Sequence, residues 1–183
     1  MELLLPAGSP EQAWEALNNG ADAVYFGLKD FSARKAAHNF TEEEARELKQ
    51  LCLDKGKKLY CTLNTVIRNS ELPELARILR FLEYLEADGI IMQDFAVLNL
   101  IKKMQIDIPV HSSTQAAVHN ADGAKFMHES GIKRIILARE LTVREIEKIH
   151  SEVPETEIEV FVHGAMCLSV SGNCFASAFI TGR

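Results

Sequence analysis

Short apolar runs alternate with longer amphipathic segments along the whole chain, and this alternation restricts the possible folds more than any other feature. Seven runs are typical of strands: 2–5, 23–26, 58–63, 89–92, 110–112, 134–137 and 158–162. Each intervening segment is long enough to hold a helix that returns the chain to the same end of a sheet. Strands that alternate with helices predict βα units, a parallel sheet and the α/β class.

Seven βα strands favour a (β/α)8, TIM-barrel-like fold over an open sheet, because no G-x-G-x-x-G follows the first strand as a dinucleotide fold would require. A complete barrel has eight strands and takes about 250 residues. This chain has 183 residues. We therefore expect a single barrel-type domain over 1–183 that is incomplete, with its eighth strand missing and its carboxyl end truncated.

Helix boundaries are marked by capping residues and by glycines. Ser9 followed by Pro10 predicts one helix start, and Thr41 with Glu44 reads as a capping box at another. Glycine after the last turn predicts where helices end. The glycines in such positions are Gly20, Gly56, Gly89 and Gly131.

Charge and apolar content restrict the partners. The chain has 20 Lys and Arg against 26 Asp and Glu, a net charge of −6, which argues against a general nucleic-acid coat but leaves room for a local basic site. No apolar run approaches the ~20 residues of a membrane-spanning helix, and no basic segment precedes the first apolar run as in a secretory signal. We expect a cytoplasmic protein without a membrane partner.

Polar side chains follow the predicted strands at their carboxyl ends, where barrel enzymes place their sites. These residues are Asn64, Asp94, Gln115, Arg139 and His163. Together they could bind a small polar or anionic molecule, with the Arg139 guanidinium facing a carboxylate or phosphate. His163, Arg139 and Asp94 are also the candidates for catalysis. The alternative for each is that it caps a neighbouring helix.

Charged residues stand at the opposite ends of the strands, and we interpret them as solubilising groups. They are Lys57, Lys58, Asp88, Lys133, Arg134 and Glu157. The segment 28–40 is the longest connection and carries Lys29, Arg34, Lys35 and His38. A loop of this length is often a lid or a binding segment, so its basic residues could meet an anionic partner such as RNA; a solvated loop is the alternative.

Two cysteines follow the last predicted strand. Cys167 and Cys174 are separated by a segment that includes Gly172, and thiolates at this position suit an iron–sulfur cluster. A four-iron cluster or a zinc site takes four ligands, so the others must come from elsewhere. Cys52 lies on the apolar face of a predicted helix and Cys61 in a strand, where we expect both to be structural. A competing interpretation makes Cys167 a nucleophile with His163 as its base.

The segments around these cysteines resemble a known family. Glu159 to Cys167, then Gly172-Asn173-Cys174 and Ser177, are similar to the signature of the collagenase-like peptidases called U32, although Ala176 replaces a larger aliphatic residue. The opening Leu5-Pro6-Ala7-Gly8-Ser9 and the segment Gly20 to Gly27 resemble the start of that family. The resemblance therefore covers essentially the whole chain.

The resemblance implies hydroxylation of tRNA or ribosomal RNA bases, or of the ubiquinone ring without oxygen, by proteins that hold an iron–sulfur cluster. Cys167 and Cys174 match its first two ligands, which implies a 4Fe-4S cluster with two of its four ligands in this chain. Our leading hypothesis is an RNA-base hydroxylase with tRNA as its favoured substrate and with a small anionic co-substrate. The alternatives are a collagenase-like peptidase and a non-catalytic barrel fragment that forms a homodimer through an unpaired strand edge.

Overall fold

The computed structural model describes residues 1–33, 38–164 and 167–174, which contain seven parallel strands and six α-helices. The chain divides into two compact units, Met1–Ile108 and Pro109–Arg183. Seven parallel βα strands confirm the predicted α/β class, and the described residues contain no eighth strand. One domain over 1–183 stays a prediction.

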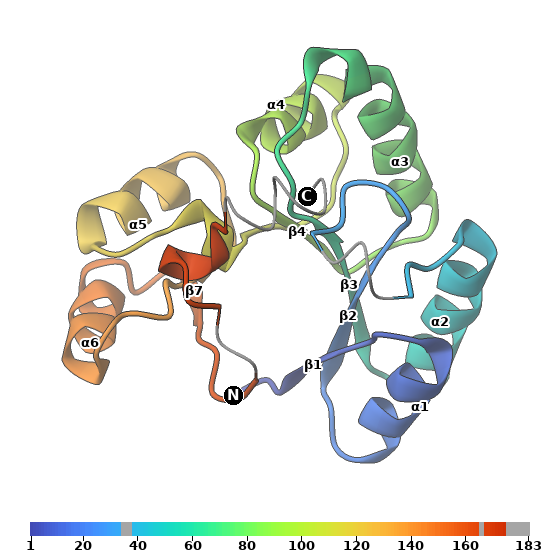
Figure 1. The fold of residues 1–183 in the computed structure, drawn as a ribbon, viewed down its shortest axis with the longest axis horizontal. Helices are drawn as coiled ribbons and strands as arrows, with labels where there is room; N and C mark the ends of the chain where they lie inside the picture. The colour runs from blue at the N-terminus through green and yellow to red at the C-terminus, as the bar shows by residue number, and fades with distance from the viewer. Residues whose placement is uncertain (34–37, 165–166, 175–183) are drawn as a thin grey trace. The chain divides into compact units, whose positions relative to one another are not determined.

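The first unit holds four strands that pair in chain order (Figure 1). Its elements are β1 (Leu4–Pro6), α1 (Pro10–Asn18), β2 (Ala23–Gly27), α2 (Glu42–Asp54), β3 (Lys58–Leu63), the 3-10 turn η1 (Asn69–Glu71), α3 (Leu72–Tyr84), β4 (Gly89–Met92) and α4 (Phe95–Met104). In β3 every residue after Lys58 is buried, because parallel strands are covered on both faces. This explains the nearly continuous apolar run in its sequence.

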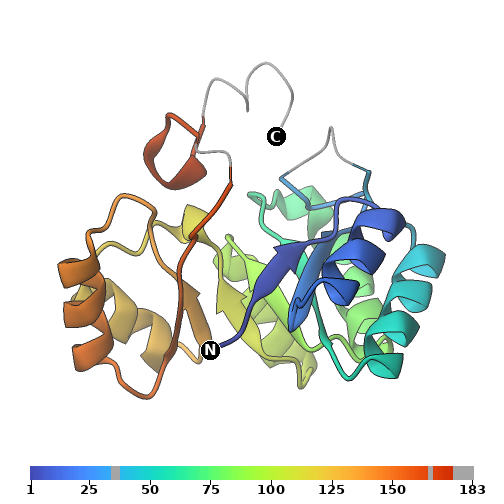
Figure 2. The same cartoon turned by 90° about the horizontal axis from the view of Figure 1, so that it is seen from below.

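The second unit holds the remaining three strands, and β5 pairs with β6 and β6 with β7. Its elements are β5 (Val110–Ser112), η2 (Thr114–Ala116), α5 (Ala121–Glu129), β6 (Arg134–Ile136), α6 (Val143–Glu152), β7 (Glu157–Glu159) and η3 (Val170–Gly172). The short turn η3, red in Figure 2, lies at the end of this unit where its strands finish. The turn η3 therefore lies at the carboxyl ends of the strands of this unit (Figure 2).

All seven predicted strands overlap observed ones, but the first and the last differ most: 2–5 was predicted where β1 covers Leu4–Pro6. The predicted bounds of β3, β4 and β5 are those observed, whereas the predicted strand 158–162 is wrong: β7 covers Glu157–Glu159. Its partner β6 ends at Ile136, and the last bond between their chains runs from the Leu137 N–H to the Glu159 carbonyl at 3.0 Å. The three apolar residues that follow β7 are exposed, because β6 offers them no further backbone partner.

Capping residues begin the helices as predicted. Ser9 accepts the Gln12 N–H at 3.2 Å, and Thr41 forms a complete capping box with Glu44. The prediction that Gly89 ends a helix is wrong, because Gly89 is the first residue of β4. After α3 the left-handed conformation is taken by Glu86, with a φ of 55°, so a non-glycine residue makes this turn.

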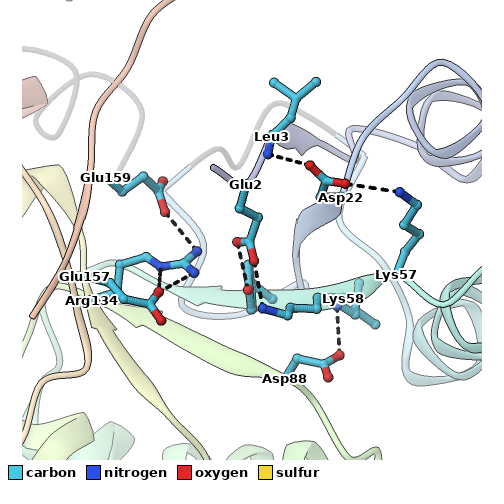
Figure 3. Close-up of polar contacts among 11 residues, drawn as sticks. Glu2, Leu3, Asp22, Lys57, Lys58, Asp88, Arg134, Glu157 and Glu159 are labelled. Atoms are coloured by element: carbon cyan, nitrogen blue, oxygen red, sulfur yellow. Dashed lines mark hydrogen bonds and ion pairs between the residues drawn. The ribbon is translucent and has the colours of Figure 1, made fainter.

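In the first unit, the charges at the amino ends of the strands are ordered by specific contacts (Figure 3). Asp88 accepts both the Leu59 backbone N–H at 2.9 Å and the Lys49 ammonium at 2.8 Å, and the Lys49 side chain is only 8% exposed. Glu2 pairs with Lys58 at 2.8 Å. The interpretation of Asp88 as a solubilising charge is therefore wrong, because its carboxylate holds a buried cation.

In the second unit, the charged side chain of Arg134, at the start of β6, is likewise ordered by specific contacts. Its side chain is buried and donates from Nε to Glu157 at 2.7 Å, while Nη1 lies 3.4 Å from Glu159 (Figure 3). Both glutamates belong to β7, so the ion pairs join neighbouring strands. Arg134 was predicted to be solvated, and this is wrong because its guanidinium is covered and satisfied within the sheet.

Candidate functional site

The segment from Cys167 to Cys174, here called the cysteine loop, carries the two predicted metal ligands in the second unit. Both cysteines are half-buried, and neither forms a disulfide. The Ser169 N–H lies 3.5 Å from the Cys167 sulfur, in position to donate to it. The turn η3 lies between the two thiols and determines the backbone path of the loop.

Glu140 binds the middle of the cysteine loop. Its Oε1 accepts the Ser171 backbone N–H at 2.6 Å, and its Oε2 accepts the Ser171 hydroxyl at 2.8 Å. The backbone N–H donated by Ser171 is the main reason that the pKa of Glu140 falls to about 2, because it stabilises the carboxylate. The sequence analysis did not select Glu140, although it directly follows Arg139 at the end of a predicted strand.

The loop after β5 supplies further contacts to the cysteine loop. The Asn173 side-chain amide donates to the Gln115 carbonyl at 3.1 Å. His119 Nε2 lies 3.4 Å from Glu140 Oε2, and its Nδ1 is 2.7 Å from the Ala117 carbonyl. Because a carbonyl only accepts, Nδ1 carries the hydrogen in that bond. Sequence spacing gave no signal for His119.

Gln115 and Arg139 lie after the neighbouring parallel strands β5 and β6, as predicted. Three of their side-chain atoms, Gln115 Oε1 and Arg139 Nε and Nη2, are buried and have no hydrogen-bond partner among the described residues. Leaving such atoms unsatisfied costs free energy. These atoms are therefore available to bind a polar or anionic ligand.

Asn64 and Asp94 lie in the first unit, at the carboxyl ends of β3 and β4. Asn64 Oδ1 accepts the Ala33 N–H at 3.0 Å and faces a cavity of about 50 Å³. Asp94 caps α4 through Ala96 N–H at 2.8 Å, and its other oxygen accepts the Ile67 N–H at 2.9 Å. Helix capping, the alternative considered for these residues, thus accounts for one Asp94 oxygen, and a loop backbone N–H occupies the other.

The cavity beside Asn64 lies at the carboxyl ends of the first three strands. Its lining is Pro6, Ala7, Gly8, Tyr25, Phe26, Gly27, Ser32, His38, Asn39, Thr62 and Asn64. A Cβ on Gly27 would stand 2.4 Å from the Ser32 hydroxyl oxygen, so the backbone approaches the lining closely there. The cavity has room for a small polar group.

His163 lies four residues beyond the end of β7 and is exposed. The described residues show no hydrogen bond between His163 and Cys167, and they contain no cluster of three or more His, Cys, Asp or Glu placed to hold a metal. The thiol and imidazole expected to act as a pair are therefore not joined. Their catalytic pairing stays a hypothesis.

The other two cysteines are buried, as expected. Burial raises the pKa of the Cys52 thiol to about 11, and burial also raises that of Cys61. A thiol held in the neutral form is a poor ligand and a poor nucleophile. Of the four cysteines, Cys167 and Cys174 are thus the ones suited to bind metal.

The cysteine loop fits part of an iron–sulfur site. Two half-buried thiols on a segment bonded to neighbouring loops match the donor type of a 4Fe-4S cluster and half of its ligand number.

The basic segment 28–40, predicted as a lid or binding segment, is described in part. His38 Nε2 lies 3.1 Å from the Glu44 carboxylate, and Lys29 is also among the described residues. The predictions for Arg34, Lys35, Ala176 and Ser177 concern residues outside the described part of the chain.

Comparisons with known proteins give a consistent result. The model of peptidase family U32 matches residues 8–183. The chain is 42% identical to a Helicobacter pylori tRNA hydroxylation protein P, over 100% of the chain and 44% of that protein. It is 40% identical to the Escherichia coli 23S rRNA 5-hydroxycytidine C2501 synthase, over 100% of the chain and 27% of that protein.

A third relative is named for proteolysis. The chain is 33% identical to a Porphyromonas gingivalis collagenase, over 96% of the chain and 44% of that protein. It thus spans less than half the length of these curated relatives.

The solved structure of the U32 peptidase Mk0906 has the same fold. Its TM-score is 0.77 at 18% identity, and the match covers 100% of this chain and 78% of that one. The predicted TIM-barrel-like class is confirmed.

Proposed function

The chain belongs to peptidase family U32. On this basis we propose that it is part of an enzyme that hydroxylates an RNA base, with tRNA as the favoured substrate. The observation that carries the proposal is the 42% identity, over the whole chain, to a protein named for tRNA hydroxylation. The ribosomal RNA hydroxycytidine synthase supports the same chemistry on a second RNA.

Cys167 and Cys174 would supply two thiolates to a 4Fe-4S cluster. When bound, such a cluster can transfer electrons or activate an oxygen donor, which protein side chains alone do poorly. The cysteine loop supports this assignment because its two thiols are half-buried while the other two cysteines are fully enclosed.

Arg139 would bind an anion, either a substrate phosphate or a small anionic co-substrate. Its Nε and Nη2 hydrogens have no partner among the described residues, and guanidinium groups bind carboxylates and phosphates with two parallel bonds. Gln115 Oε1 is equally unsatisfied, so it would accept a hydrogen bond from an N–H or O–H of the substrate. These two side chains would orient the bound molecule.

Asn64, Asp94 and His163 complete the proposed substrate-binding set. Asn64 would contribute through the small cavity of the first unit, and Asp94 would act mainly by fixing the start of α4, since both its oxygens accept backbone N–H groups. His163 is exposed, so it would exchange protons with solvent or substrate. A cytoplasmic setting belongs to the proposal, because tRNA and reduced thiols are found there. None of the helices in the described segments is long and apolar enough to cross a bilayer.

The first test measures iron, acid-labile sulfide and the visible spectrum of protein purified without oxygen. Stoichiometric iron and sulfide that disappear in Cys167→Ala/Cys174→Ala but persist in Cys52→Ala would support the cluster. The Cys52 variant is a control because it removes a thiol that lies outside the cysteine loop. Absence of iron from this chain and from a longer version of the protein would reject the cluster.

A second test concerns the reaction. In cells that lack the gene, we expect a hydroxylated tRNA nucleoside to disappear from mass-spectrometric profiles and to return with the wild-type gene. Arg139→Gln should restore it poorly, because the amide cannot pair with an anion. Unchanged tRNA and ribosomal RNA profiles in the deletion would contradict the proposed function.

A collagenase-like peptidase is the second candidate, favoured by the similarity to the Porphyromonas gingivalis collagenase. Cys167 would then act as the nucleophile with His163 assisting. Cleavage of gelatin by protein without iron, lost in Cys167→Ala, would support this activity. Ser171 is a poor candidate nucleophile, because its hydroxyl donates to the Glu140 carboxylate and not to a histidine.

A further inference from the structure

We propose that Glu140 is a positioning residue that fixes the conformation of the cysteine loop before any metal binds. The proposal deepens the proposed function and rests on it in one respect, since the loop carries the two proposed ligands. Glu140 is not itself one of the proposed ligands. It acts through Ser171, which lies between them in the chain.

The contact is specific because one carboxylate accepts two donors from one residue. The Ser171 backbone N–H and hydroxyl bind separate oxygens of Glu140 at 2.6 and 2.8 Å. Hydrogen bonds to a charged acceptor are stronger than those between neutral groups. The two bonds together fix both the backbone and the side chain of Ser171.

The conformation of Ser171 shows why such a contact is needed. Its φ is 49°, in the left-handed region that L-residues rarely adopt, and its side chain is fully buried. That conformation is unfavourable for a residue with a side chain. Ser171 therefore needs compensating bonds to stay in place, and Glu140 supplies them.

One other contact holds the same loop, and a second lies beside Glu140. Asn173 donates to the Gln115 carbonyl at 3.1 Å, and His119 stands 3.4 Å from the Glu140 carboxylate. His119 is itself bonded to Ala117, whose φ is also in the left-handed region at 55°. The loops after β5 and β6 thus both contact the cysteine loop, through Gln115 and through Glu140.

The test measures how fast iodoacetamide alkylates each cysteine in the folded, metal-free chain, resolved by mass spectrometry. In Glu140→Gln we expect Cys167 and Cys174 to react about tenfold faster than in wild type, because the amide nitrogen cannot accept a bond and the loop opens more often. Glu140→Asp keeps an acceptor-only carboxylate and should give an intermediate rate. The alkylation rates of the buried Cys52 and Cys61 show whether the rest of the chain stays folded.

Glu152→Gln is the matched control, since it removes a carboxylate that pairs with Lys125 in the same unit. If Glu140→Gln alters folding, Ser171→Ala tests the proposal instead. It removes only the hydroxyl bond to Glu140 and should still raise the alkylation rates of Cys167 and Cys174. Rates equal to wild type in Glu140→Gln, or in a folded Ser171→Ala, would overturn the proposal. Iron content reports the cluster separately: a chain that never binds iron but shows faster alkylation rejects the cluster and upholds the role of Glu140.

Discussion

At the scale of single residues, the contacts that sequence predicts least well are those between residues that lie far apart in the chain. Arg139 and Gln115 could be predicted from sequence, because they directly follow apolar strands. Glu140 could not be selected, because its partner Ser171 lies 31 positions away. Arg134 and Asp88 were misjudged for the same reason: their burial depends on partners that local sequence does not reveal.

Replacing Asp88 tests the buried charge at the start of β3. We expect Asp88→Asn to lower the free energy of unfolding by about 2 kcal/mol, because the Lys49 ammonium keeps its charge but loses its partner. The Asp88 side chain is 32% exposed, which places the loss at the low end for a buried pair. Urea unfolding measures the change.

The same experiment has an internal control. Lys49→Met in the Asp88→Asn background should recover most of the loss, since it removes the unpaired cation and keeps the apolar stem. A loss in Asp88→Asn that persists unchanged in the double variant would show that the Leu59 hydrogen bond, and not the ion pair, provides the stability.

The low pKa of Glu140 predicts how its contribution depends on pH. A carboxylate with a pKa of about 2 in the folded protein and 4.5 as its ordinary value stabilises the fold fully above pH 4.5. That stability is lost as the pH falls from 4.5 towards 2. The difference in unfolding free energy between wild type and Glu140→Gln should therefore be constant from pH 7 to 5 and then shrink.

Glu155→Gln serves as the comparison, because Glu155 is exposed in the same unit. Its difference from wild type should stay small at every pH. If the Glu140→Gln difference were instead greatest at pH 3, the hydrogen bonds from Ser171 would not be what stabilises the carboxylate.

At the scale of elements, capping residues could be predicted well because they act over three positions. The capping box of Thr41 and Glu44 is a local pattern, and it begins α2 as expected. The turn after α3 could not be predicted, because Glu86 adopts a left-handed conformation without glycine. The end of β7 was missed because a strand stops where its neighbour stops, and sequence periodicity does not contain that information.

Thr41 offers a direct test of the cap. Thr41→Ala should lower the free energy of unfolding by about 1 kcal/mol, because the Glu44 N–H loses its acceptor at 3.2 Å. Thr41→Ser keeps the hydroxyl and should stay within a few tenths of a kcal/mol of wild type. Thermal or urea unfolding of the three proteins gives the result, and equal losses in both variants would mean that the Thr41 methyl matters and the cap does not.

At the scale of the whole molecule, the TIM-barrel-like class could be predicted because strands and helices alternate regularly along the chain. The family could be predicted because the segments around Cys167 and Cys174 resemble its signature. The ligand set of the cluster could not be completed, since two of four expected thiols are in this chain. The substrate was predicted by resemblance and not from charge, because a net charge of −6 gives no RNA-binding signal.

Self-association through a strand edge stays a prediction, and the residues after β7 provide its test. Val160, Phe161 and Val162 are exposed, and Val162 is the most exposed of the three at 86%. If this edge forms a dimer, sedimentation should show association that increases with protein concentration and that Val162→Asp abolishes, because a charge at an apolar interface opposes association. Thr142→Ser is a suitable control on a different surface, and a monomer at every concentration would exclude the dimer.

The contacts of Glu2 have a practical consequence for anyone who purifies this protein. Its carboxylate binds Lys58 and accepts the Tyr60 hydroxyl at 3.0 Å, and the next residue donates its backbone N–H to Asp22 at 3.0 Å. An affinity tag joined directly to Met1 would therefore sit against a structured edge of the sheet. A flexible spacer between tag and Met1 should preserve the native yield, and tags that crowd Glu2 should reduce it.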